Sequence, residues 1–174
     1  MSARTLIVGL GNPILGDDGV GWHVADEVQS RIHAPTSDLR PQGTRDQRLE
    51  IDVDCVSLGG LSLMERMVGY ERAIVIDAVS TGRWPTGTVS RLALEDLPDV
   101  SAGHTSSAHD TSLQTALTMG RAMGVSLPAE VTVVAVEAQT TYDFSEELSA
   151  PVEAAVPRAA DLVLELVQSE FARE

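Results

Sequence analysis

The sequence predicts an α/β fold of three layers, in which a twisted, mainly parallel sheet of five strands lies between helices. Residues 6–10, 72–79 and 131–137 are apolar without alternation, which is typical of strands buried on both faces. Helical patterns separate these strands, and this order favours a parallel sheet with helices on both faces. The length of 174 residues fits one domain, residues 1–174.

The first half of the chain predicts three strands and two helices. The strand at 6–10 runs into a glycine-rich turn, and a helix starts at Asp18, with Asp17 either as its N-cap or as a supporting residue behind Asp18. Apolar residues repeat every four positions along this helix: Val20, Val24, Val28 and Ile32. The remaining elements are an exposed polar loop at 34–48, a strand at 49–56, a short helix at 61–68 and a strand at 72–79.

The second half predicts two strands and two longer helices. No helical pattern separates the strand at 72–79 from the next strand, at 88–94, so we expect this fourth strand to be antiparallel to its neighbour. The remaining elements are a polar loop at 95–108, a helix at 109–123, a strand at 131–137, a loop at 138–149 and a helix at 151–171. We expect Val20, Trp22 and the 138–149 loop to shape a groove for a peptide.

The charge and the cysteine content exclude several classes of protein. A net charge of −14 argues against nucleic acid or an anionic membrane as partner. The single cysteine, Cys55, rules out an internal disulfide and is expected to be a small buried apolar residue. The N-terminus has neither the pattern of a signal peptide nor a membrane span, so we expect a cytoplasmic protein.

Three side chains predict a site at the carboxyl edge of the sheet. Right-handed crossovers bring the ends of the first and third strands to one rim, which places Asp18 near Asp77; His109 follows a loop and opens a helix. Two carboxylates and an imidazole suit a divalent transition metal such as nickel or zinc. His104 is a rival to His109, and Asp18 with Asp77 could instead share a proton as an acid dyad.

Other chemistries fit the sequence poorly. Ile14 stands where a dinucleotide-binding turn needs its third glycine, and the acids that follow would repel a pyrophosphate. The chain has no Gly-x-Ser-x-Gly motif and no Walker lysine motif. Cys55 lies within a strand without an evident histidine partner, so a thiol nucleophile is not expected. His23 and His33, on the first helix, are expected to be surface groups.

Taken together, these residues resemble the hydrogenase maturation proteases, endopeptidases that process the large subunits of nickel–iron hydrogenases. The matching segments are residues 6–12 with Asp17 and Asp18 behind them, Gly59–Gly60, residues 74–78, residues 107–109 with Leu113 and Leu117, and the strand at 131–136 with its C-terminal helix. The order and spacing of these segments, rather than any one of them, carry the resemblance.

The resemblance implies the roles of the three side chains. The metal ligands and catalytic residues of the family fall on Asp18, Asp77 and His109, which demotes His104. The metal is nickel, supplied by the hydrogenase large-subunit precursor, and zinc or cadmium can take its place. The metal, or a carboxylate beside it, would polarise the scissile carbonyl and activate a water. The implied partner is that precursor, and we expect the protease to be a monomer.

Three other functions stay open at this point. Peptidyl-tRNA hydrolases also begin with a strand and Gly-Leu-Gly-Asn-Pro, but a tRNA-binding esterase should carry a basic face. A non-catalytic nickel-binding maturation chaperone could use the same three ligands. A nucleotide-binding domain would bind NAD or ATP tightly.

Overall fold

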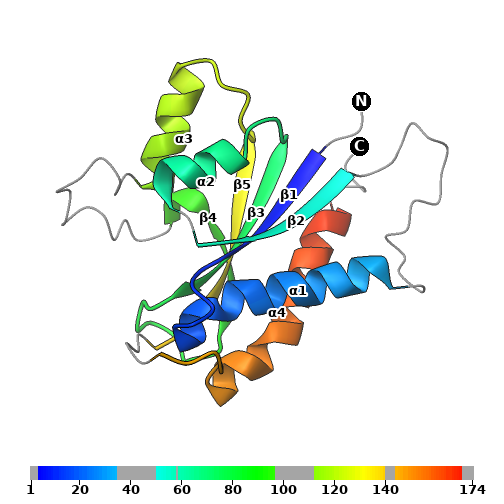
Figure 1. Ribbon diagram of the computed structural model, residues 1–174, viewed down its shortest axis with the longest axis vertical. Coiled ribbons are helices and arrows are strands. Elements are labelled where there is room, and N and C mark those ends of the chain that lie inside the picture. Colours follow the sequence, from blue (N-terminus) through cyan, green and yellow to red (C-terminus); the bar gives the residue numbers. More distant parts are fainter. Residues whose placement is uncertain (1–3, 35–49, 58, 97–111, 140–143, 170–174) are drawn as a thin grey trace.

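A five-stranded sheet with the strand order β2-β1-β3-β5-β4 runs through the middle of the molecule (Figure 1). The computed structural model describes residues 4–34, 50–57, 59–96, 112–139 and 144–169. The strands are β1 (Arg4–Leu10), β2 (Glu50–Val56), β3 (Arg72–Val79), β4 (Val89–Ala93) and β5 (Glu130–Glu137). The predicted three-layer α/β fold is thereby confirmed.

Whether two consecutive strands of the chain are separated by a helix determines the direction of the second strand. The pairs β1–β2, β1–β3 and β3–β5 are parallel, and helices connect the strands along the chain. Strand β4 follows β3 without an intervening helix and pairs antiparallel with β5, with Val89 opposite Val136. The predicted antiparallel strand is therefore confirmed, and its partner is β5.

Helices cover both faces of the sheet (Figure 1). Helices α1 (Val20–His33) and α4 (Ala150–Ser169) pack against each other on one face, and α2 (Gly60–Arg66) and α3 (Leu113–Ala122) do so on the other. Strand β1 contributes to both cores: Ile7 faces the first pair of helices, and Leu6 and Val8 face the second. This two-sided burial explains why the strand lacks polar alternation. No helix among the described residues is long and apolar enough to span a membrane.

Several predicted boundaries shift. Short 3-10 helices, η1 (Gly16–Gly19) and η3 (Leu94–Asp96), precede α1 and follow β4. Helix α3 begins at Leu113 rather than at the predicted residue 109, because the Ser112 side chain caps it by accepting a hydrogen bond from the backbone N–H of Thr115. Most of the predicted 34–48 and 95–108 loops lies outside the described residues.

Helix α1 approaches the sheet backbone to backbone. A Cβ atom added to Gly21 would lie 2.2 Å from the carbonyl oxygen of Leu10 and 2.5 Å from that of Ile76. A Cβ atom on Gly9 would lie 2.3 Å from the carbonyl oxygen of Gly21. The first turn of α1 therefore sits directly on the ends of β1 and β3, an approach that only glycine permits.

Gly21→Ala is expected to lower the free energy of unfolding by about 3 kcal/mol, because the added methyl group meets rigid backbone. Gln29→Ala, at an exposed position of the same helix, should change it by less than about 0.5 kcal/mol. Urea denaturation followed by circular dichroism measures both values. Equal stability of the two variants would contradict the close contact.

Candidate active site

The turn after β1 is built around the carboxylate of Asp18. The backbone N–H of Asn12 donates a hydrogen bond to Oδ2 of Asp18 at 2.6 Å. Gly11 has a φ of +128°, and a Cβ atom there would lie 1.9 Å from the carbonyl oxygen of Asp18. The chain therefore wraps tightly around Asp18, whose side chain stays exposed at the carboxyl edge of the sheet.

Asp77 lies near the carboxyl end of β3, beside β1 on one side and opposite Ala135 of β5 on the other. Burial, followed by the negative charge of Asp18, raises the pKa of Asp77 to about 7, although a hydrogen bond with the backbone of Ala78 favours the charged form. No basic side chain of the described part of the chain contributes to this shift. The charge of Asp18 thus acts on Asp77, and no cation among the described residues offsets it.

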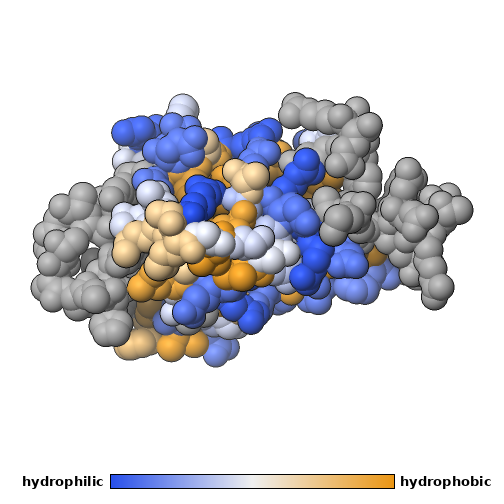
Figure 2. Space-filling model, turned by 90° about the horizontal axis from the view of Figure 1, so that it is seen from above, coloured by the Kyte–Doolittle hydropathy of each residue, from blue (hydrophilic) through white to orange (hydrophobic). Residues whose placement is uncertain are grey.

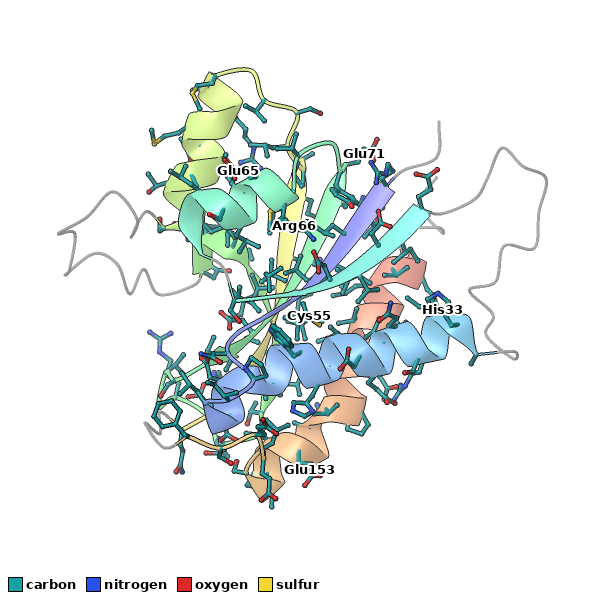
Figure 3. All side chains as sticks on the ribbon, viewed as in Figure 1. His33, Cys55, Glu65, Arg66, Glu71 and Glu153 are labelled. Atoms are coloured by element: carbon teal, nitrogen blue, oxygen red, sulfur yellow. The ribbon has the colours of Figure 1, made fainter. Side chains whose placement is uncertain are left out.

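The structure brings together two of the three predicted site residues. Asp18 and Asp77 lie at one edge, whereas His109, like its rival His104, lies outside the described residues. Within the described ranges, no three His, Cys, Asp or Glu side chains form a group that could hold a metal ion. The third ligand therefore stays a prediction. His23 and His33 are exposed on α1, as expected, and Figure 3 shows His33 at the end of that helix far from η1.

Of the two roles predicted for Asp17, the helix cap is wrong and the supporting role agrees with its contacts. Neither η1 nor α1 has a side-chain N-cap: the cap positions are Leu15 and Gly19. The Asp17 side chain is instead buried, and it accepts hydrogen bonds from the backbone N–H of Ser149 at 2.7 Å and from its hydroxyl at 2.8 Å. Asp17 therefore fixes the start of α4 against the turn that holds Asp18.

Glu137, at the end of β5, is a buried acid that the sequence reasoning did not single out. Its carboxylate accepts hydrogen bonds at 2.7–2.8 Å from the backbone N–H groups of Thr81 and Gly82 and from the Thr81 hydroxyl. The signal was available, because Glu137 ends an apolar strand just as Asp77 does. Glu137 holds the loop that follows Asp77.

The two side chains expected to shape a groove, Val20 and Trp22, differ in their exposure to solvent. Val20 is fully buried in the core beside α4, so its predicted place in a groove is wrong. Trp22 is half-buried, and its indole N–H donates to the carbonyl oxygen of Val56 at 3.3 Å. Cys55 faces α1 (Figure 3), and burial raises the pKa of its thiol to about 11, which leaves it unreactive.

Comparison with known proteins identifies the family. The family model described as hydrogenase maturation protease matches residues 51–166, a range that includes Asp77 and His109 and begins after Asp18. The hydrogenase expression/formation protein HupD of Rhizobium leguminosarum bv. viciae is 25% identical over 172 residues, which cover 95% of this chain and 75% of that protein.

The similarity to solved structures supports the same family. A hydrogenase 2 maturation peptidase from a Thaumarchaeota archaeon is 30% identical, with a TM-score of 0.55 over 94% of this chain and 97% of that one. The hydrogenase maturating endopeptidase HybD from E. coli shares the fold, with a TM-score of 0.71 and 24% identity over 96% of this chain and 93% of that one. This α/β chain therefore belongs to the hydrogenase maturation protease family.

The raised pKa of Asp77 predicts a characteristic dependence of stability on pH. Unfolded Asp has a pKa of about 3.9, so the folded protein retains this proton up to about pH 7. The stability that Asp77 contributes is fully present below about pH 4 and is lost as the pH rises through about 7. Asp77→Asn should therefore gain stability relative to the wild type as the pH rises from 4 to 8.

Urea denaturation of the metal-free protein across this pH range measures the effect. Asp18→Asn serves as the matched variant, because it removes the neighbouring charge and should lower the pKa of Asp77. Parallel stability curves for the wild type and Asp77→Asn would show that Asp77 does not titrate in this way.

Proposed function

We propose that this protein is an endopeptidase that removes the C-terminal extension of a nickel-loaded precursor of a nickel–iron hydrogenase large subunit. The observation that carries the proposal is the Asp18–Asp77 carboxylate pair at the carboxyl edge of the sheet, in a chain of the maturation protease family. The pair lacks a neutralising cation among the described residues, and an arriving dication would supply one.

In this proposal the nickel is part of the substrate. Asp18, Asp77 and His109 bind it while it is seated in the precursor, so that only a loaded precursor is recognised. Two carboxylates and an imidazole are ligands that suit nickel, and zinc or cadmium could take its place in solution. Because the dication displaces the proton of Asp77, recognition of the nickel is coupled to the charge of the site.

Cleavage adds water across one peptide bond. The water oxygen bonds to the scissile carbonyl carbon, the C–N bond breaks, and the leaving nitrogen gains a proton. A carboxyl group with a pKa near 7 can take a proton from the attacking water and deliver one to the leaving nitrogen, and we assign these transfers to the carboxylate pair. The nickel would supply Lewis-acid polarisation of the carbonyl. No serine or cysteine nucleophile is required.

Incubation with a purified precursor from the organism that encodes this chain tests the reaction. Mass spectrometry should show loss of a C-terminal peptide from the nickel-loaded precursor and no loss from the nickel-free precursor. Binding of the loaded precursor without any mass loss would make this protein a maturation chaperone instead. Hydrolysis of an aminoacyl-tRNA ester would favour the esterase alternative, which the net charge of −14 disfavours.

His109→Ala should abolish processing, because it removes the imidazole ligand, while the far-ultraviolet circular dichroism spectrum stays that of the wild type. His104→Ala is the matched control and should process the precursor at the wild-type rate. Full activity of the His109 variant would discard the assignment of this ligand.

A further inference from the structure

Two aromatic side chains are exposed at the edge that carries the site. The chain contains only two each of Trp, Tyr and Phe. Trp84 nevertheless leaves 58% of its surface exposed and Phe144 leaves 83% exposed, on the loops that follow β3 and β5. An aromatic ring stabilises a fold by being buried, so folding gives no reason to expose either one, whereas binding does.

The loop that carries Trp84 is held at both ends by Glu137. The carboxylate of Glu137 accepts hydrogen bonds from Thr81 and Gly82 at the start of the loop. Its backbone carbonyl accepts from the N–H of Gly87, and its own N–H donates to the carbonyl of Thr88, at the end of the loop. Trp84 therefore projects from a loop whose two ends are fixed to one buried residue.

The segment from Phe144 to Ser149 is held in a similar way. The N–H of Ser145 donates to the carbonyl of Ile14 at 3.0 Å, and the N–H of Gly16 donates to the carbonyl of Ser145 at 2.6 Å. The carboxylate of Asp17 binds Ser149 a few residues further on. Phe144 is thus fixed to the same turn that places Asp18.

The two loops also meet at the first turn of α4. A Cβ atom on Gly87 would lie 2.3 Å from the carbonyl oxygen of Pro151, so the end of the Trp84 loop rests on this helix. Figure 1 shows both loops beside η1 and the start of α1, at one end of the molecule. Trp84 thus lies on a loop with fixed ends and Phe144 lies next to the fixed Ser145, both at the edge that carries the carboxylate pair.

We propose that Trp84 and Phe144 are docking contacts for apolar side chains of the hydrogenase precursor beside its nickel, and that Glu137 and Asp17 hold the two loops ready for this contact. The inference rests on the proposed function: if the carboxylate pair meets the nickel, the precursor surface around the nickel must cover these loops. Aromatic side chains on rigid loops lose little entropy on binding and commonly dominate interfaces between proteins.

A second exposed apolar region provides a matched control. Figure 2 shows apolar side chains at the surface of the opposite end of the molecule, and Met119 and Met123, at the end of α3, are half or more exposed. Nothing in the structure indicates what would cover them. Met123 is 69% exposed, comparable to Trp84, but lies away from the carboxylates.

The test is steady-state processing of the nickel-loaded precursor by Trp84→Ala, Phe144→Ala and Met123→Ala. Each edge variant should raise KM about tenfold with kcat within about twofold, because an interface contact is lost while the reacting groups stay. Met123→Ala should keep the wild-type KM. Since all three side chains are exposed, the melting temperatures should stay within about 2 °C of the wild type.

The outcomes separate this inference from the proposed function. If the wild type cleaves the precursor and both edge variants keep its KM, the docking contacts are wrong and the protease function stands. If the wild type does not cleave, its affinity for the loaded precursor is measured by biolayer interferometry instead of KM. The inference is overturned if the wild type does not bind the precursor. It is also overturned if Trp84→Ala and Phe144→Ala both bind the precursor with wild-type affinity. Wild-type self-association that Trp84→Ala abolishes would assign the surface to a second copy of the chain.

Glu137 variants test the holding role. Glu137→Gln keeps an oxygen that can accept from the Thr81 and Gly82 amides and should raise KM less than about threefold, whereas Glu137→Met removes both bonds and should match Trp84→Ala. Hydrogen exchange at residues 81–82 should be faster in Glu137→Met only. Val131→Ala, at the other end of β5, controls for destabilisation. Slow exchange or an unchanged KM in Glu137→Met would refute the holding role.

Discussion

The site depends on a contact between backbones. Gly21 in the first turn of α1 lies against the carbonyl groups of Leu10 and Ile76, which belong to neighbouring strands. Because η1 precedes this turn directly, the contact sets Asp18 beside the end of β3, where Asp77 follows Ile76. The two carboxyl groups are thus brought together by packing that does not involve them. The pKa of Asp77 is raised first by burial and then by the negative charge of Asp18.

The four acidic side chains at this edge differ in the number of hydrogen bonds that they accept. Asp17 and Glu137 are buried, and each accepts from two or three donors at 2.7–2.8 Å, which offsets the cost of burying a carboxylate. Among the described residues, Asp18 accepts a hydrogen bond from the Asn12 amide, and a hydrogen bond with the backbone of Ala78 favours the charged form of Asp77. The acids with several donors hold loops, and the other two are the pair to which the proposed function assigns the nickel.

The sequence predicted the fold well, because the strands are buried on both faces and their apolar runs reveal this directly. It also predicted that Asp18 and Asp77 share an edge, since right-handed crossovers fix the ends of β1 and β3. It left two roles open for Asp17, because a capping residue and a residue that holds a distant segment have the same local sequence. Ser149 is far along the chain, and no local pattern announces that pairing. Glu137 was missed although it stands at the carboxyl end of an apolar run, as Asp77 nearly does.

The carboxyl edge of the sheet is open to the surface, and a folded protein substrate reaches an open edge more easily than a deep cavity. A cavity of about 360 Å³ does exist, but Arg91, Arg121 and Glu130 line it at the amino end of β5, away from Asp18 and Asp77. The nickel ion of the proposed function, seated in a large precursor, cannot enter such a cavity but can approach the exposed carboxylate of Asp18. The described segments at that edge are fixed by buried acids, Glu137 at Thr81 and Gly82 and Asp17 at Ser149, so they can be both rigid and accessible.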